Sequence, residues 1–208
     1  MVIVALGDST TAGTPLFKSP IEAPPKGAGD EKSQYAYWLM QKRPGWQVLN
    51  RGVNGERTDQ IAARFSRDVL NVGAAAVVII AGVNDVYQGK NTGYVTQHLR
   101  QLYNLAVDAN LPVIAGSIVP YNTATIDQNT RMHEVNAWIR REASLDPHLH
   151  FVDTRKACAA ADNPDRLAGS PDGLHPDVDG YRKMAIAIEE VIVRALDIRE
   201  ESEGQLHP

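Results

Sequence analysis

The sequence predicts an α/β protein built on a doubly wound parallel sheet. Short apolar runs alternate five times with longer amphipathic segments along the 208 residues. Two of the apolar runs lack polar alternation, which is typical of strands that helices cover on both faces. Small or polar residues follow every predicted strand, and right-handed crossovers are expected between strands.

The elements follow from apolar periodicity. Five strands are predicted, at residues 2–6, 46–50, 75–81, 112–119 and 150–153. The helices are predicted from apolar residues at helical spacing, as with Ile61, Phe65 and Val69 after a possible N-cap at Thr58. These helices are expected at residues 33–43, 58–70, 92–109, 127–145 and 177–198.

Three segments do not fit the alternation of strand and helix. Residues 14–30 contain four prolines and a Gly-Ala-Gly, so we expect a long irregular loop. Loops of this length are functional lids or disordered segments, and the position just after Ser9 favours a lid. Residues 157–171 are expected to form a second loop. We predict one domain over residues 1–198 and a frayed polar tail over residues 199–208.

Composition excludes several functional classes. The chain has 21 basic and 25 acidic side chains and a formal net charge of -4, so nucleic acid is not an expected partner. No apolar stretch reaches the roughly 18 residues of a membrane span. The single cysteine, Cys158, cannot form an intramolecular disulfide and is interpreted as a packing residue. The start of the chain lacks a secretion signal pattern, which favours a cytoplasmic location, and no metal-ligand spacing is present.

The residues after each strand carry the candidate chemistry, because ligands bind beyond the carboxyl ends of strands in such sheets. Acyl transfer by serine needs a hydroxyl, a base and a group that orients the base. Ser9 supplies the hydroxyl and His175 the base, and Asp172 lies three residues before His175. The Ser9 and Gly55 backbone N–H groups and the Asn84 amide could stabilise an oxyanion.

Each of these residues also has a purely structural interpretation. Ser9 could be a helix cap, Gly55 a turn residue, and Asp172 and His175 parts of an ordinary loop. A Gly-x-Ser-x-Gly elbow is absent because Thr11 occupies the position of the second glycine. The case for catalysis rests on the whole set, which follows successive strands in order.

The set resembles the SGNH subgroup of the GDSL esterases and lipases. The motifs that carry the resemblance are Leu6-Gly7-Asp8-Ser9, Asn50-Arg51-Gly52-Val53-Asn54-Gly55, Gly82-Val83-Asn84-Asp85 and Asp172-Gly173-Leu174-His175-Pro176. The resemblance implies a flavodoxin-like three-layer α/β/α fold, with a five-stranded parallel sheet in the order 2-1-3-4-5 and no cofactor.

The resemblance also implies residue roles. Ser9 would be the nucleophile, His175 the general base and Asp172 its partner, with the oxyanion hole formed by Ser9, Gly55 and Asn84. Gly55 is preferred to Gly52 because it ends the family's pattern of apolar, small polar and glycine residues. Supporting roles are implied for Asp8 and Asp85. The chain departs from the family pattern at Thr10-Thr11 and in the length of residues 14–30.

The expected function is hydrolysis of small carboxylic esters, with short acyl groups preferred. The residues expected to line the substrate pocket are Val86, Tyr87, Tyr121, Asn122 and Leu174. Alternatives within the family are a carbohydrate O-acetylesterase and a lysophospholipase or thioesterase. A non-catalytic, flavodoxin-like ligand-binding module is the alternative from another class. The sequence leaves the oligomeric state open.

Overall fold

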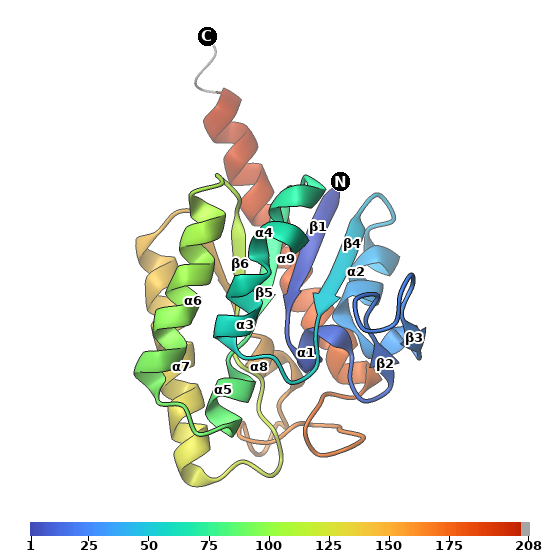
Figure 1. Ribbon diagram of the computed structural model, residues 1–208, viewed down its shortest axis with the longest axis vertical. Helices are drawn as coiled ribbons and strands as arrows, with labels where there is room; N and C mark the ends of the chain where they lie inside the picture. Colours follow the sequence, from blue (N-terminus) through green and yellow to red (C-terminus); the bar gives the residue numbers. More distant parts are fainter. Residues whose placement is uncertain (205–208) are drawn as a thin grey trace.

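The computed structural model describes residues 1–204 and confirms the predicted α/β fold (Figure 1). A five-stranded parallel sheet has the order β4-β1-β5-β6-β7, which is 2-1-3-4-5 when its strands are numbered along the chain. Its strands are β1 (Val2–Gly7), β4 (Gln47–Gly52), β5 (Ala76–Ile80), β6 (Val113–Gly116) and β7 (Leu149–Val152).

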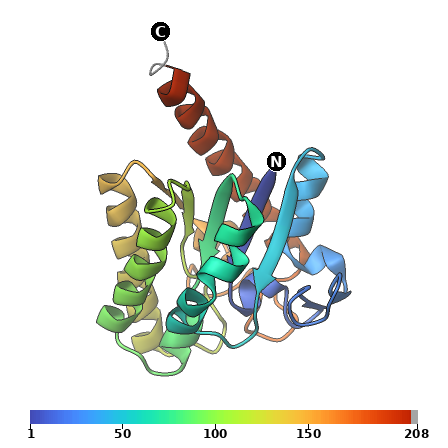
Figure 2. The ribbon, with the colours of Figure 1, turned by 45° about the horizontal axis from the view of Figure 1, so that its top comes forward.

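Helices cover both faces of this sheet and make three layers (Figure 2). Successive side chains of β1 point to opposite faces of the sheet, and both sets are apolar, so both faces must be covered. Val4 and Leu6 pack into one apolar cluster, and Ile3 and Ala5 pack into the other. The first cluster takes its helical residues from α3 (Thr58–Ala63), α4 (Phe65–Asp68), α5 (Val83–Tyr87), α6 (Thr92–Val107) and α7 (Ile126–Leu145). The second takes them from α2 (Tyr35–Lys42), α8 (Thr154–Cys158) and α9 (Val178–Gly204).

Two of the predicted helices differ in extent from the observed ones. The helix expected over residues 58–70 is interrupted at Arg64, whose φ of −106° and ψ of 5° are not helical, and a 3₁₀ turn (Leu70–Val72) follows α4. The last helix runs to Gly204, six residues beyond its predicted end at 198. Arg and Glu are good helix formers, so residues 199–204 continue the helix instead of forming the frayed tail that we expected. The rest of that tail, residues 205–208, lies outside the described residues.

Several short helices and strands at the strand exits and in the loops were not predicted from the sequence. Helices α1 (Ser9–Ala12) and α5 (Val83–Tyr87) directly follow β1 and β5, and α8 starts before the loop predicted at 157–171. Residues 14–30 include a small antiparallel pair, β2 (Phe17–Lys18) and β3 (Ala28–Gly29), and a 3₁₀ turn (Glu31–Ser33) follows them. Helices of one turn are too short to show apolar periodicity.

The longest helices do not have the hydropathy of membrane spans. Within residues 1–204, no helix is both long enough and apolar enough to cross a bilayer.

Candidate active site

Ser9, His175 and Asp172 form one continuous hydrogen-bonded chain at the carboxyl edge of the sheet. His175 Nε2 lies 2.9 Å from Ser9 Oγ, and His175 Nδ1 lies 2.7 Å from Asp172 Oδ2. Ser9 is 4% exposed and His175 is 8% exposed, so their contact is largely shielded from water. The fold therefore brings together a hydroxyl, an imidazole and a carboxylate in the geometry that general-base activation requires.

The end of β1 holds Ser9 in place. Gly7 must be glycine, because a Cβ there would lie 2.3 Å from the Ile80 carbonyl oxygen. Asp8 then caps α1, its Oδ1 accepting a hydrogen bond of 2.9 Å from Thr10 N–H. Ser9 is consequently the first residue of a one-turn helix and not merely its cap.

The loop that carries His175 is organised by the Asp172 carboxylate. Its Oδ1 accepts hydrogen bonds of 2.9 Å from both the Leu174 and the His175 N–H groups, while Oδ2 faces the imidazole. Burial acts to raise the pKa of Asp172, but the hydrogen bonds from the His175 ring and these N–H groups outweigh it and lower the pKa. Asp172 is therefore ionised at neutral pH and favours the His175 tautomer with hydrogen on Nδ1.

Ser170 is a contributor that sequence reasoning missed. Its Oγ donates a 2.7 Å hydrogen bond to the His175 carbonyl and accepts a 2.8 Å bond from Gly173 N–H. These contacts close the loop around Asp172. A serine in a loop rich in Gly and Pro is too common a pattern to signal this role.

The predicted oxyanion donors lie at three neighbouring strand exits. Asn84 Nδ2 donates a 3.0 Å hydrogen bond to the Glu56 carbonyl, which ties α5 to the β4 exit loop (residues 53–56). The Asn84 amide has a second hydrogen still to donate. Within the described part of the chain, neither Ser9 N–H nor Gly55 N–H donates a hydrogen bond to another protein group. These backbone donors are thus free to bind an oxyanion.

The two glycines of the β4 exit have different constraints. A Cβ on Gly52 would lie 2.1 Å from Ala12 N, so Gly52 permits close packing of α1 on β4. Gly55 has a φ of +80° and open space around its Cβ position. Glycine is therefore favoured at position 55 by the positive φ of the β4 exit loop, and at position 52 by the close packing against α1.

The two supporting aspartates have different surroundings. Asp85 accepts hydrogen bonds from Thr58 N–H (2.9 Å) and Thr58 Oγ1 (2.7 Å), which links α5 to the start of α3. Asp8 is 1% exposed, and its Oδ2 has no hydrogen-bond partner among the described residues. Burial raises the pKa of Asp8 to about 7.

The residues expected to line the pocket differ in their exposure and in their contacts. Val86 does not reach the surface: it is 0% exposed because it lies on the inner face of α5, so its prediction as a lining residue is wrong. Tyr87 is 56% exposed and packs edge-on over the buried Tyr121 at a centroid distance of 5.8 Å. Leu174 is partly buried against the core.

Asn122 is hydrogen-bonded to the loop that carries Asp172 and His175. Its N–H donates to the Gly173 carbonyl (2.7 Å), and its Oδ1 accepts from Leu167 N–H (2.8 Å). Since these groups are already engaged, the structure gives Asn122 a loop-bracing role in addition to the predicted contact with substrate.

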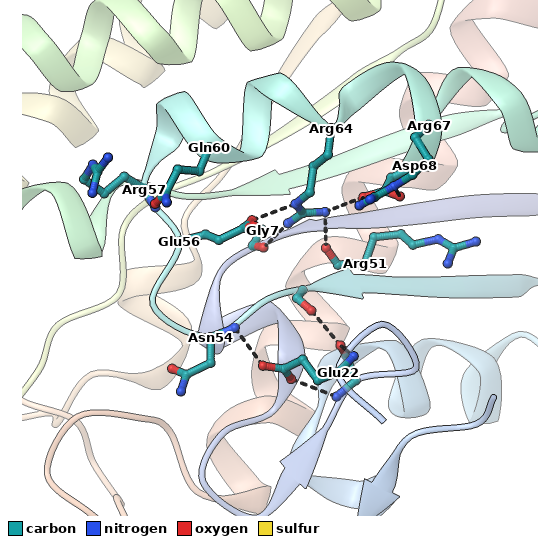
Figure 3. A network of polar contacts seen from close by, with 12 residues as sticks. Gly7, Glu22, Arg51, Asn54, Glu56, Arg57, Gln60, Arg64, Arg67 and Asp68 are labelled. Atoms are coloured by element: carbon teal, nitrogen blue, oxygen red, sulfur yellow. Dashed lines mark hydrogen bonds and ion pairs between the residues drawn. The ribbon is translucent and has the colours of Figure 1, made fainter. Parts of the chain in front are cut away.

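The proline-rich segment (residues 14–30) is anchored to the exit of β4. Ser19 Oγ donates a 2.6 Å hydrogen bond to the Gly52 carbonyl. Glu22 Oε1 accepts a 2.9 Å bond from Asn54 N–H (Figure 3). The segment therefore braces the β4 exit loop. Its predicted action as a lid stays a prediction.

Burial raises the pKa of the Cys158 thiol to about 12, which keeps it protonated. Across residues 1–204, no cluster of three or more His, Cys, Asp or Glu side chains is arranged to hold a metal ion.

Comparison with known proteins gives a consistent match over most of the chain. The model of the GDSL-like Lipase/Acylhydrolase family matches residues 5–183. No curated protein sequence matches at a significant level.

Several solved structures share the fold. A GDSL-like lipase from Bacteroides thetaiotaomicron is 23% identical over 93% of this chain and 88% of its own, with a TM-score of 0.73. A member of the lipolytic protein G-D-S-L family from Veillonella parvula is 21% identical over 93% of this chain and 99% of its own (TM-score 0.75). A carbohydrate acetylesterase from Sinorhizobium meliloti is 13% identical over 93% of this chain and 98% of its own, with a TM-score of 0.73.

Proposed function

The chain belongs to the GDSL-like lipase/acylhydrolase family, and we propose that it is a serine hydrolase that cleaves carboxylic esters through an acyl-enzyme on Ser9. The observation that carries this proposal is the hydrogen-bonded chain from Ser9 Oγ through His175 to Asp172. A nucleophile, a base and an orienting group in contact are the requirements for covalent acyl transfer.

In the first half-reaction, Ser9 Oγ attacks the ester carbonyl carbon while His175 Nε2 takes the hydroxyl proton. The oxyanion that forms accepts hydrogen bonds from the Ser9 and Gly55 N–H groups and the Asn84 amide. When the carbonyl re-forms, the bond to the alcohol oxygen breaks and the alcohol leaves with the proton held by His175.

The second half-reaction repeats these steps with water. His175 takes a proton from water as its oxygen attacks the acyl carbon, and collapse of the new oxyanion breaks the bond to Ser9 Oγ. Ser9 recovers its proton from His175 and the carboxylic acid is released. Asp172 accepts the hydrogen bond from Nδ1–H throughout, so that Nε2 faces Ser9 and the imidazolium is stabilised.

We expect short acyl groups to be preferred. Tyr121 is 2% exposed and Val86 is fully buried, so two of the apolar side chains nearest the strand exits already belong to the core. Less apolar surface is then left to cover a long acyl chain, whose binding scales with buried area. A panel of p-nitrophenyl esters from acetate to palmitate tests this preference; a maximum at long chains would favour a lysophospholipase or thioesterase instead.

A carbohydrate O-acetylesterase is the second candidate. The exposed ring of Tyr87 beside the candidate site offers an aromatic surface of the kind that suits a sugar ring, and the carbohydrate acetylesterase from Sinorhizobium meliloti shares the fold. Release of acetate from acetylated xylan at rates above those for p-nitrophenyl acetate would support this assignment. A rate on xylan far below that on the aryl ester would reject it.

The variant Ser9→Ala tests the proposed function itself. Removing the nucleophile is expected to lower kcat by at least about 10⁴. Unchanged turnover would assign the hydrolysis to another group. Absence of turnover in the wild type on every ester would leave the non-catalytic ligand-binding module as the better account.

A further inference from the structure

Arg64 lies at the centre of a polar network that joins the ends of β1 and β4, through hydrogen bonds to Gly7, Arg51, Glu56 and Asp68 (Figure 3). Its side chain is 7% exposed and lies at the break between α3 and α4. Burial of a guanidinium is costly unless its donors are satisfied, so the partners of Arg64 indicate what it stabilises.

Two partners of Arg64 are carbonyls at the ends of adjacent strands. Nη2 donates to the Gly7 carbonyl, and Nη1 donates to the Arg51 carbonyl, each at 2.8 Å. Gly7 ends β1 and is followed directly by Asp8 and Ser9. The guanidinium thus holds the peptide from which the nucleophile turn starts.

The third partner leads to the oxyanion donors. Arg64 Nε donates a 2.6 Å hydrogen bond to Glu56 Oε2, and the Glu56 carbonyl accepts the 3.0 Å bond from Asn84 Nδ2. Glu56 also follows Gly55 in the chain. Glu56, which Arg64 binds, is therefore linked to two of the three proposed oxyanion donors, Gly55 and Asn84.

The remaining partner balances charge. Arg64 Nη1 donates to Asp68 Oδ2 at 2.7 Å, and Asp68 also binds the exposed Arg67. A planar guanidinium can donate in several fixed directions at once, whereas the ammonium of lysine cannot span these acceptors. The site therefore requires arginine in particular.

From these contacts we infer that Arg64 is a positioning residue, which fixes the nucleophile turn and the oxyanion donors relative to each other. The inference rests on the proposed function, since it assigns Arg64 an effect on ester turnover. Because the donors act on the oxyanion of the transition state, their misplacement lowers kcat more than it raises KM.

The test compares three variants with p-nitrophenyl acetate. Arg64→Lys keeps a buried cation but loses the planar fork, and we expect kcat to fall about 10- to 100-fold with little change in KM. Glu56→Gln keeps the side-chain length and removes the charge on the link, with a fall of about 10-fold expected. Arg67→Gln removes a neighbouring guanidinium that is 66% exposed and binds only Asp68 in the network, and it is expected to keep the wild-type kcat.

A double-mutant cycle separates positioning from general destabilisation. If Glu56 acts through Asn84, the loss of kcat from Glu56→Gln is smaller in an Asn84→Ala background than in the wild type. Independent, multiplicative losses would contradict the link. The burst of p-nitrophenol measures the concentration of active sites, so kcat is calculated per active site and a misfolded fraction does not lower it. If Arg64→Lys fails to fold, the Glu56 cycle alone tests whether the network positions Asn84.

The outcomes separate this inference from the proposed function. A Ser9→Ala variant that loses turnover, together with wild-type kcat in Arg64→Lys and Glu56→Gln, overturns the role of Arg64 alone. A Ser9→Ala variant with full turnover overturns both.

Discussion

Replacing Asp8 by Asn isolates the cost of a buried carboxylate beside Ser9. The substitution preserves the oxygen that accepts the hydrogen bond from Thr10 N–H, at 2.9 Å in the wild type. The second carboxylate oxygen has no partner among residues 1–204, so an amide nitrogen there breaks no observed contact. The variant therefore removes the charge with little other change.

The magnitude follows from the shift in the pKa of Asp8. Burial raises this pKa from 3.8 to about 7. Between these values the folded protein holds a proton that the unfolded chain has released, so the wild-type free energy of unfolding falls as pH rises through that window. A pKa raised from 3.8 to about 7 corresponds to a loss of about 4 kcal/mol in the free energy of unfolding, complete above pH ~7.

Urea unfolding of both proteins between pH 4 and 8.5 measures this effect. The free energy of unfolding of Asp8→Asn minus that of the wild type should be near zero at pH 4 and rise to about 4 kcal/mol at pH 8. A difference that does not change with pH would refute the reasoning.

Asp172→Asn provides a control of opposite sign. Hydrogen bonds lower the pKa of Asp172 in the folded state despite its partial burial, so its ionised form stabilises the fold above its unfolded pKa. The stability of Asp172→Asn relative to the wild type should therefore decrease as pH rises from acid to neutral.

Three further predictions concern activity. The rate of ester hydrolysis should fall on acidification, because protonated His175 cannot accept the Ser9 proton, and a flat profile from pH 5 to 9 would contradict the assigned base. Asn84→Ala should lower kcat by about 10²–10³ with little change in KM, measured by steady-state kinetics; an unchanged kcat would exclude Asn84 from the oxyanion hole. Tyr87→Ala should raise KM and leave kcat unchanged if the exposed ring binds substrate, whereas an unchanged KM would remove Tyr87 from the pocket.

The sheet and the candidate triad could be predicted because topology decides both. Parallel strands place their carboxyl ends at one edge, so residues 166 positions apart, Ser9 and His175, meet there. The fold order followed from the family resemblance and is confirmed by the observed sheet.

The errors arise where periodicity carries no information. Ile61, Phe65 and Val69 are all buried as their spacing indicates, yet the helix breaks at Arg64 between them. The partners that the break allows Arg64 to reach lie 57, 13 and 8 residues away in sequence, at Gly7, Arg51 and Glu56. No local pattern encodes such contacts.

Val86 shows a second limit of the sequence. Its place just after β5 suggested a pocket residue, but α5 has only five residues, too few to reveal which face is apolar. The neighbouring Tyr87 is exposed while Val86 is completely buried. Orientation within so short an element is decided by tertiary packing.

The central claim is that Ser9 is the nucleophile of an ester hydrolase, and a covalent probe tests it most directly. The protein is treated with a p-nitrophenyl alkylphosphonate, and the labelled peptide is mapped by mass spectrometry. We expect one phosphonate per chain on Ser9, no label on Ser9→Ala, and slower labelling of His175→Ala because the base is missing. An unlabelled wild-type protein, or a label on a residue other than Ser9, would contradict the account.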